Sequence, residues 1–65
     1  MQTRLKESRE NAGLTQQQLA DYTGVTRQTI LFLEKCQYNP SLRLAFKIAK
    51  VLKMPVDVLF TFDDE

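Results

Sequence analysis

The stretch TGVTRQTILFLEK, residues 23–35, begins as a turn and continues as a helix with four large apolar residues in succession at 30–33. Gly24 suits the end of a preceding helix because glycine readily adopts the left-handed conformation, and Thr26 can cap the helix that follows. A short helix usually buries only one face. The sequence therefore predicts two helices joined by a tight turn, and the apolar run on the second helix must serve more than one purpose.

Two more stretches in the first half of the chain carry helix signals. The sequence GLT at 13–15 repeats the pattern of GVT at 24–26, and TQQQ at 15–18 has the spacing of a capping box. Helices end at such glycines and begin after such threonines. We therefore expect three helices here, one ending near Ala12, one at about 16–23 and one at about 27–35.

The second half of the chain predicts two more helices. QYNPS at 37–41 is a turn, because Asn and Pro disfavour a helix, and Ser41 can cap the next one. In LRLAFKIAKVLK at 42–53, apolar residues recur every three or four positions, which is typical of an amphipathic helix. Pro55 suits the first turn of a fifth helix. We expect a single all-α domain over residues 1–65, with a short acidic tail at 61–65.

The charge is unevenly distributed along the chain. Residues 1–53 hold all nine Lys and Arg with four acidic residues, a net charge of +5, whereas residues 54–65 hold four acidic residues and a net charge of −4. Basic surface attracts polyanions such as nucleic acids. Sixty-five residues enclose only a small core, and the chain has no histidine and no Gly-rich phosphate loop. We therefore expect no enzymatic activity, no cofactor, no metal and no small-molecule ligand.

The cysteine content and the hydropathy indicate a compartment. Cys36 is the single cysteine, so no disulfide can form within the chain, which favours a reducing environment. No apolar run approaches the roughly 20 residues of a membrane span, and the polar start MQTRLKESRE is not a signal peptide. We expect a cytoplasmic protein that does not contact a membrane.

The two helices at 16–23 and 27–35 have the spacing of a helix-turn-helix. Ala20 is small enough for the helices to approach closely, Gly24 relieves the turn, and Ile30 and Leu33 point back toward the first helix. In a helix-turn-helix the two helices cross at roughly 90 to 120°, and the second one lies in the major groove of DNA.

The stretch GLTQQQLADYTGVTRQTILFLEKCQYNPSL, residues 13–42, resembles the phage-repressor and Cro type of helix-turn-helix DNA-binding domain, particularly its minimal single-domain bacterial members. The resemblance extends over residues 3 to about 60. It implies a compact five-helix fold, binding of double-stranded operator DNA, usually as a dimer, and transcriptional regulation. It implies no enzymatic activity.

The helical period separates an inner and an outer face on the helix at 27–35. With Ile30 placed at 0° and about 100° per residue, Leu33 falls about 60° away, whereas Gln28, Phe32 and Lys35 fall at about 160°, 200° and 140°. The inner face therefore centres between Ile30 and Leu33. The other three side chains point the opposite way.

Four residues of this helix are the candidates for contacts with bases. Arg27 and Gln28 lie in the first turn, where arginine can bind guanine O6 and N7 and glutamine can bind adenine N6 and N7. Thr29 lies on the flank of the helix. Phe32 either touches a thymine methyl group or packs with Leu31 under the loop at 36–41.

Phosphate contacts are expected first from Gln16 and Gln17, because the free backbone N–H groups and the dipole of a helix N-terminus favour an anion. The alternative is that these glutamines are only solvated helix formers. The resemblance supports Gln16 most, and it implies that the loop after the recognition helix follows the DNA backbone. Tyr38 in that loop is either such a contact or a lid on the core. The remaining candidates for phosphate contacts are Thr26, Lys35, Tyr38, Asn39 and Ser41.

The resemblance also assigns a structural role and shows one departure. Arg9 and Glu34 correspond to a charge pair that joins the first helix to the end of the third. Cys36 stands where the family commonly has glycine, so a left-handed conformation there would cost on the order of 1 kcal/mol. A redox or crosslinking role for this cysteine is the alternative to an inert one.

We interpret the chain as a sequence-specific DNA-binding transcriptional regulator that acts as a homodimer, because one such module contacts too few base pairs for tight binding. The expected dimer surface is the fifth helix and the tail, with Val58, Phe60 and Phe62. The alternative is an antitoxin-like protein-interaction module, in which a partner protein docks on Leu31, Phe32 or the tail.

Overall fold

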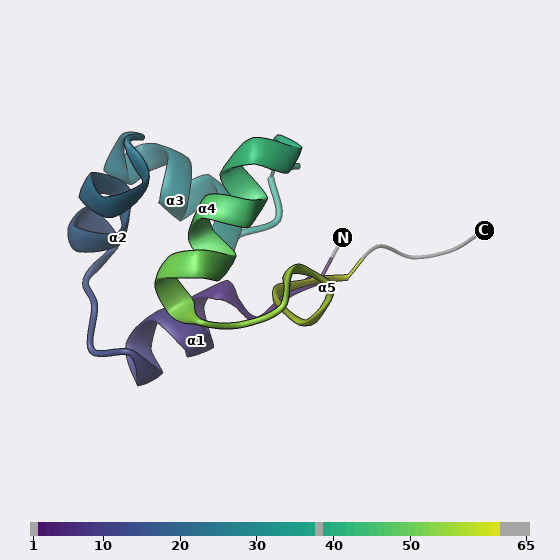
Figure 1. Ribbon diagram of the computed structural model, residues 1–65. Helices are drawn as coiled ribbons and strands as arrows, with labels where there is room; N and C mark the ends of the chain where they lie inside the picture. The colour runs from purple at the N-terminus through teal and green to yellow at the C-terminus, as the bar shows by residue number, and fades with distance from the viewer. Residues whose placement is uncertain (1, 38, 62–65) are drawn as a thin grey trace.

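The computed structural model describes residues 2–37 and 39–61 (Figure 1). All five predicted helices are present, with boundaries within one or two residues of those expected. A short strand lies at each end of the described chain. The elements in order are β1 (Gln2–Thr3), α1 (Leu5–Asn11), α2 (Gln16–Thr23), α3 (Arg27–Glu34), α4 (Leu42–Leu52), α5 (Val56–Leu59) and β2 (Phe60–Thr61).

The predicted caps form at the starts of α2, α3 and α4. Thr15 and Gln18 make the capping box: the Thr15 hydroxyl accepts from the Gln18 backbone N–H at 3.0 Å, and the Gln18 side chain accepts from the Thr15 N–H at 2.8 Å. Thr26 and Ser41 cap α3 and α4 by accepting from the N–H groups three residues on. These local hydrogen bonds satisfy N–H groups that the helices leave free.

The ends of the helices use left-handed residues, as predicted at Gly24, where φ is 75°. Cys36 also has a positive φ of 57°. The Cys36 N–H donates to the Leu33 carbonyl at 3.1 Å and the Gln37 N–H to the Phe32 carbonyl at 2.9 Å. This is the Schellman arrangement that usually carries glycine at its left-handed position. The unfavourable conformation expected at Cys36 is therefore present.

The core lies between the helices and is closed from below by α1 (Figure 1). Ile30 and Leu33 of α3 are 0% exposed, as are Leu19 and Ala20 of α2. The face predicted to be inward is thus the buried one, and Ala20 of α2 belongs to the same core. Among the described residues, the buried apolar side chains are Leu5, Leu19, Ala20, Ile30, Leu33, Leu44, Ala45, Ile48, Ala49, Leu52, Leu59 and Phe60.

A two-stranded antiparallel sheet joins the two ends of the described chain, with Thr3 opposite Phe60. The Thr3 hydroxyl donates to the Leu59 carbonyl at 2.8 Å, and the Arg4 N–H donates to the same carbonyl at 2.9 Å. The sequence did not predict this sheet, because two-residue strands are too short to show alternation. The fold remains mostly helical, and the sheet holds α5 against the start of α1.

The sheet corrects one expectation about the dimer surface. Phe60 is only 3% exposed and belongs to the core of its own chain, so its ring cannot project into a symmetry mate. Val58 retains 37% exposure. Thr61, the first residue of the predicted tail, belongs to β2, and residues 62–65, which include Phe62, lie outside the described residues. Across the described residues, every helix is too short or too polar to cross a membrane.

Candidate nucleic-acid interface

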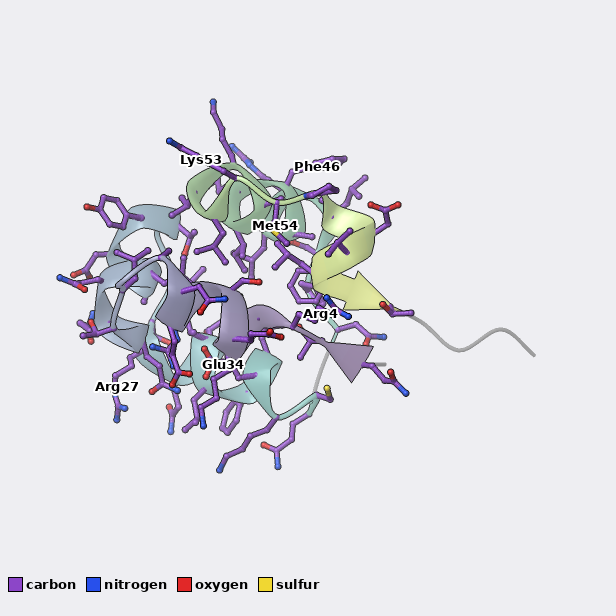
Figure 2. All side chains as sticks on the ribbon, turned by 90° about the horizontal axis from the view of Figure 1, so that it is seen from below. Arg4, Arg27, Glu34, Phe46, Lys53 and Met54 are labelled. Carbon is purple, nitrogen blue, oxygen red and sulfur yellow. The ribbon has the colours of Figure 1, made fainter. Side chains whose placement is uncertain are left out.

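α3 is fixed to the core by one face and presents the other to solvent. Ile30 and Leu33 are fully buried, whereas Arg27 and Gln28 in the first turn are exposed. Figure 2 shows Arg27 pointing away from the body of the molecule, on the side opposite Lys53 and Phe46. The helical period predicted that Gln28 points away from the buried face and that Arg27 lies on the flank, and both side chains are exposed.

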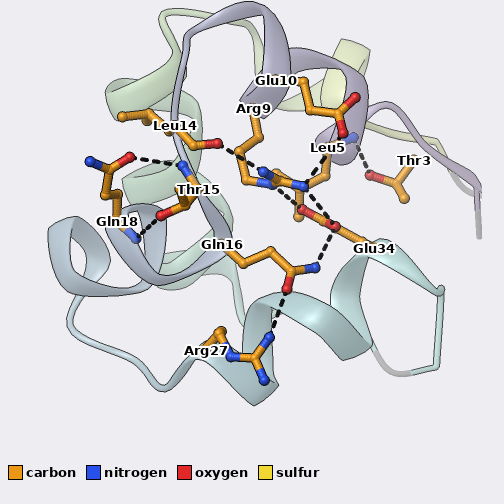
Figure 3. Close-up of polar contacts among 10 residues, drawn as sticks. All are labelled: Thr3, Leu5, Arg9, Glu10, Leu14, Thr15, Gln16, Gln18, Arg27 and Glu34. Atoms are coloured by element: carbon orange, nitrogen blue, oxygen red, sulfur yellow. Dashed lines mark hydrogen bonds and ion pairs between the residues drawn. The ribbon is translucent and has the colours of Figure 1, made fainter.

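An ion pair joins α1 to the end of α3, as the resemblance implied. The Arg9 Nε donates to Glu34 Oε2 at 2.6 Å, and the Arg9 and Glu34 side chains are 9% and 5% exposed. A second guanidinium nitrogen of Arg9 donates to the Leu14 carbonyl at 2.8 Å (Figure 3). Arg9 therefore connects three segments, namely α1, α3 and the loop that precedes α2. These segments place the helix-turn-helix on the domain.

Gln16, the first residue of α2, links the ion pair to the surface through two hydrogen bonds. The Gln16 Nε2 donates to Glu34 Oε1 at 3.0 Å, and its Oε1 accepts from Arg27 Nη1 at 3.2 Å (Figure 3). Gln16 is half-buried and Arg27 is exposed. An unbroken series of polar contacts thus runs from the buried Arg9 to the exposed first turn of α3.

Thr26 and Thr29 serve the start of α3 in the free protein. The Thr26 hydroxyl accepts from the Thr29 backbone N–H at 3.3 Å, and the two hydroxyl oxygens are 3.1 Å apart. Thr26 is exposed and Thr29 is half-buried. Both residues therefore act as part of the N-terminal cap of α3, in the same turn as Arg27 and Gln28.

The apolar run in α3 divides between the core and the surface. Ile30 and Leu33 are buried, Leu31 is half-buried, and Phe32 is 38% exposed. Phe32 therefore keeps enough accessible ring to meet a partner, while more than half of its surface is covered. The four consecutive apolar residues of α3 therefore divide into two groups. Ile30 and Leu33 belong to the core, whereas Leu31 and Phe32 remain partly accessible.

The other candidates for phosphate contacts are mostly exposed. Gln17 follows Gln16 in the first turn of α2, and its Nε2 donates to Asp21 Oδ1 at 2.9 Å. Lys35 and Asn39 are exposed, and the Ser41 hydroxyl accepts from the Leu44 N–H at 3.1 Å as a helix cap. Tyr38 lies outside the described residues.

Two features of this site had no signal in the sequence. The first is the double contact of Gln16, which depends on the relative positions of residues 16, 27 and 34. The second is the bond from Arg9 to the Leu14 carbonyl. Glutamine at the start of a helix is common among solvated helix formers, so residue type alone could not reveal either contact.

Comparisons with known proteins agree with this geometry. A family model described as a helix-turn-helix matches residues 5–59. An uncharacterized HTH-type transcriptional regulator of Archaeoglobus fulgidus is 57% identical over 65 residues, covering all of this chain and 93% of the relative. Another, from Bacillus subtilis, is 42% identical over 65 residues, covering all of this chain and 98% of the relative.

Two solved structures share the fold. The restriction-modification controller protein C.AhdI from Aeromonas hydrophila superposes with a TM-score of 0.80 at 37% identity, over 88% of this chain and 86% of that one. A transcriptional regulator from Listeria innocua has a TM-score of 0.75 at 19% identity, over 100% of this chain and 64% of that one, and its likeness concerns the fold alone.

Proposed function

Because this chain belongs to the helix-turn-helix family of transcriptional regulators, we propose that it binds a specific double-stranded DNA operator with α3 in the major groove. One observation carries the proposal: Arg27 and Gln28 are exposed in the first turn of a helix whose opposite face, Ile30 and Leu33, is fully buried. The buried face fixes the helix, and the exposed turn is free to approach base edges.

The chemistry of the exposed turn suits direct recognition of bases. The Arg27 guanidinium offers two parallel N–H donors to O6 and N7 of a guanine, and the Gln28 amide offers a donor and an acceptor to an adenine. Each such two-pronged contact discriminates against the wrong base by about 1–3 kcal/mol. Phe32, one turn further along, contributes an apolar contact with a thymine methyl group.

Phosphate contacts flank the base contacts on both sides. The first N–H groups of α2 at Gln16 and Gln17 have no acceptor within the helix, and they form one end of the phosphate-binding surface. Lys35, Asn39 and Ser41 follow α3 and form the other end. These contacts fix the register of the protein on the duplex and make binding depend on salt.

The active form is a homodimer through an apolar surface on α4 and α5. Leu42 and Phe46, one turn apart on α4, are 71% and 57% exposed, and Val58 on α5 is 37% exposed. A hollow of about 230 Å³ lined by Pro40, Leu42, Ala45, Val56 and Phe60 lies beside them. In a two-fold interface the same surface of both copies meets. Each copy here offers projecting side chains and a hollow that can receive those of the other copy. Two half-sites one helical turn apart then provide the specificity that one module lacks.

The dimer surface is tested by Phe46→Glu, with Tyr22→Glu as the matched control. Both residues are exposed aromatic side chains, at 57% and 68%, but Tyr22 lies on α2. Sedimentation at several protein concentrations should show a monomer for the Phe46 variant and a dimer for the control. If the unaltered protein sediments as a monomer and binds DNA as one, the dimer proposal fails.

The DNA proposal is tested by selecting bound duplexes from a random pool at about 0.15 M salt, where charges more than about 8 Å apart are largely screened. Arg27→Gln and Lys53→Asn each remove one positive charge, from opposite sides of the molecule (Figure 2). Asparagine tolerates the positive φ of 56° at position 53. We expect the unaltered protein and the Lys53 variant to select the same motif, and Arg27→Gln to change it at one position per half-site.

Two results of this selection contradict the proposal. One is the absence of any enriched sequence with the unaltered protein. The other is an identical motif and affinity for the Arg27 and Lys53 variants, which would mean that Arg27 contributes only its charge.

A further inference from the structure

We infer that the buried Arg9–Glu34 ion pair takes part in DNA sequence recognition, because it fixes the orientation of the Gln16 amide that holds Arg27 in place. The inference rests on the proposed contact of Arg27 with a base. It assigns Gln16 and Glu34 as positioning residues, beyond the role of the ion pair in holding α1 against α3.

The Gln16 amide can take only one orientation between its two partners. A carboxylate is only an acceptor and a guanidinium is only a donor. Glu34 therefore selects the NH₂ end of the Gln16 amide, at 3.0 Å, and Arg27 selects its oxygen, at 3.2 Å. The reversed amide would place oxygen against carboxylate and NH₂ against guanidinium. Both contacts would then be repulsive, so only one orientation is stable.

The Glu34 carboxylate has a fixed position on the domain. Its side chain is 5% exposed, and its other oxygen accepts from Arg9 at 2.6 Å. The Arg9 side chain is itself 9% exposed and also bonded to the Leu14 carbonyl. The Glu34 carboxylate is therefore held on both sides, and the Gln16 oxygen that faces Arg27 has a defined position on the domain.

The fixed Gln16 oxygen restricts the Arg27 side chain before DNA binds. A free arginine side chain loses rotamer freedom when it binds, and the loss weakens association. Gln16 occupies one of the five N–H donors of the guanidinium, so the remaining donors are sufficient for a two-pronged contact with guanine. Because Gln16 holds the guanidinium before DNA binds, binding to the preferred base pair should be about 2- to 12-fold stronger.

The test is a double-mutant cycle with Gln16→Leu and Arg27→Ala, measured on the selected operator and on a copy in which the base pair assigned to Arg27 is exchanged. The ratio of the two dissociation constants is the readout, because a lost phosphate contact weakens binding to both duplexes equally. We expect Gln16→Leu to reduce this ratio about 2- to 12-fold when Arg27 is present and to leave it unchanged in the Arg27→Ala background.

Gln17→Leu is the matched control for this cycle. Gln17 is the neighbouring glutamine on α2, and its side chain bonds Asp21 instead of Glu34. We expect its replacement to leave the ratio unchanged. An equal effect of Gln16→Leu with and without Arg27, or equal effects of the two glutamine variants, would overturn the inference. If Arg27→Ala itself leaves the ratio unchanged, the proposed function fails instead.

The role of Glu34 in orienting the Gln16 amide is tested on the unaltered protein, because variants at a buried charge can fail to fold. Solution NMR compares hydrogen exchange of the side-chain NH₂ groups of Gln16 and Gln17. We expect slower exchange and a single fixed orientation for Gln16, with a nuclear Overhauser contact to Arg27. Equal exchange rates and no contact between Gln16 and Arg27 would refute the role of Glu34.

Discussion

Replacing Arg9 by methionine should destabilise the fold more than any exposed substitution. The change removes the bond from Nε to Glu34 at 2.6 Å and the bond to the Leu14 carbonyl at 2.8 Å, and it leaves a carboxylate that is 5% exposed without its cation. Breaking one side of a buried ion pair costs about 3–5 kcal/mol. A domain of this size is stable by only about 3–10 kcal/mol.

Urea unfolding followed by circular dichroism measures this loss, with Arg4→Met as the control. Arg4 is an exposed arginine just before α1, so its replacement should change the free energy of unfolding by less than about 0.5 kcal/mol. The double variant Arg9→Met with Glu34→Leu should recover much of the loss, because a well-packed apolar pair can replace a buried ion pair. A loss below about 1 kcal/mol for Arg9→Met, or no coupling between the two positions, would refute the reasoning.

Three further predictions concern α3 and its surroundings. Cys36→Gly should raise the free energy of unfolding by about 0.5–1 kcal/mol, because glycine tolerates the φ of 57° at this position, and a loss of stability in urea would contradict this. Ile30→Ala should cost about 2–5 kcal/mol in thermal unfolding, and Phe32→Ala clearly less, since Ile30 is 0% and Phe32 is 38% exposed; equal losses would place Phe32 in the core. Raising the salt from about 50 to 200 mM should weaken operator binding at least about 100-fold, and a flat response in a binding titration would argue against the phosphate contacts.

The helices could be predicted from the sequence because their signals are local. Gly24 at the end of α2 and Thr15 and Thr26 at the starts of α2 and α3 act within a few residues. The left-handed conformation of Lys53, with φ 56°, had no such signal. Lysine has no preference for this region, so its residue type gave no indication of a left-handed end to α4.

The sheet could not be predicted, because it depends on contacts between the two ends of the chain. Thr3 and Phe60 lie far apart in the sequence, and the fold places them opposite each other in the sheet. The buried position of Phe60 follows from the same pairing, and it explains why this residue of the alternating apolar pattern near the C-terminus does not project from the surface as predicted. Short strands of this kind carry too few residues for a periodic signal.

The candidate site was partly accessible from the sequence. The period of 3.6 residues places Gln28 opposite Ile30 and Leu33 and places Arg27 on the flank, and both side chains are exposed. The contacts of Gln16 with Glu34 and Arg27 depend on side-chain rotamers and on the crossing of α2 and α3, which residue types do not specify. The structure therefore adds the link between the buried ion pair and the exposed turn.

Replacement of single guanines by 7-deazaguanine in the selected operator tests most directly whether α3 contacts bases in the major groove. The replacement removes the N7 acceptor from the groove and leaves Watson–Crick pairing intact. We predict that at one guanine per half-site it weakens binding of the unaltered protein about 5-fold or more and has no further effect on Arg27→Ala. Unchanged binding of the unaltered protein at every guanine, or an equal additional loss in the Arg27 variant, would contradict the account.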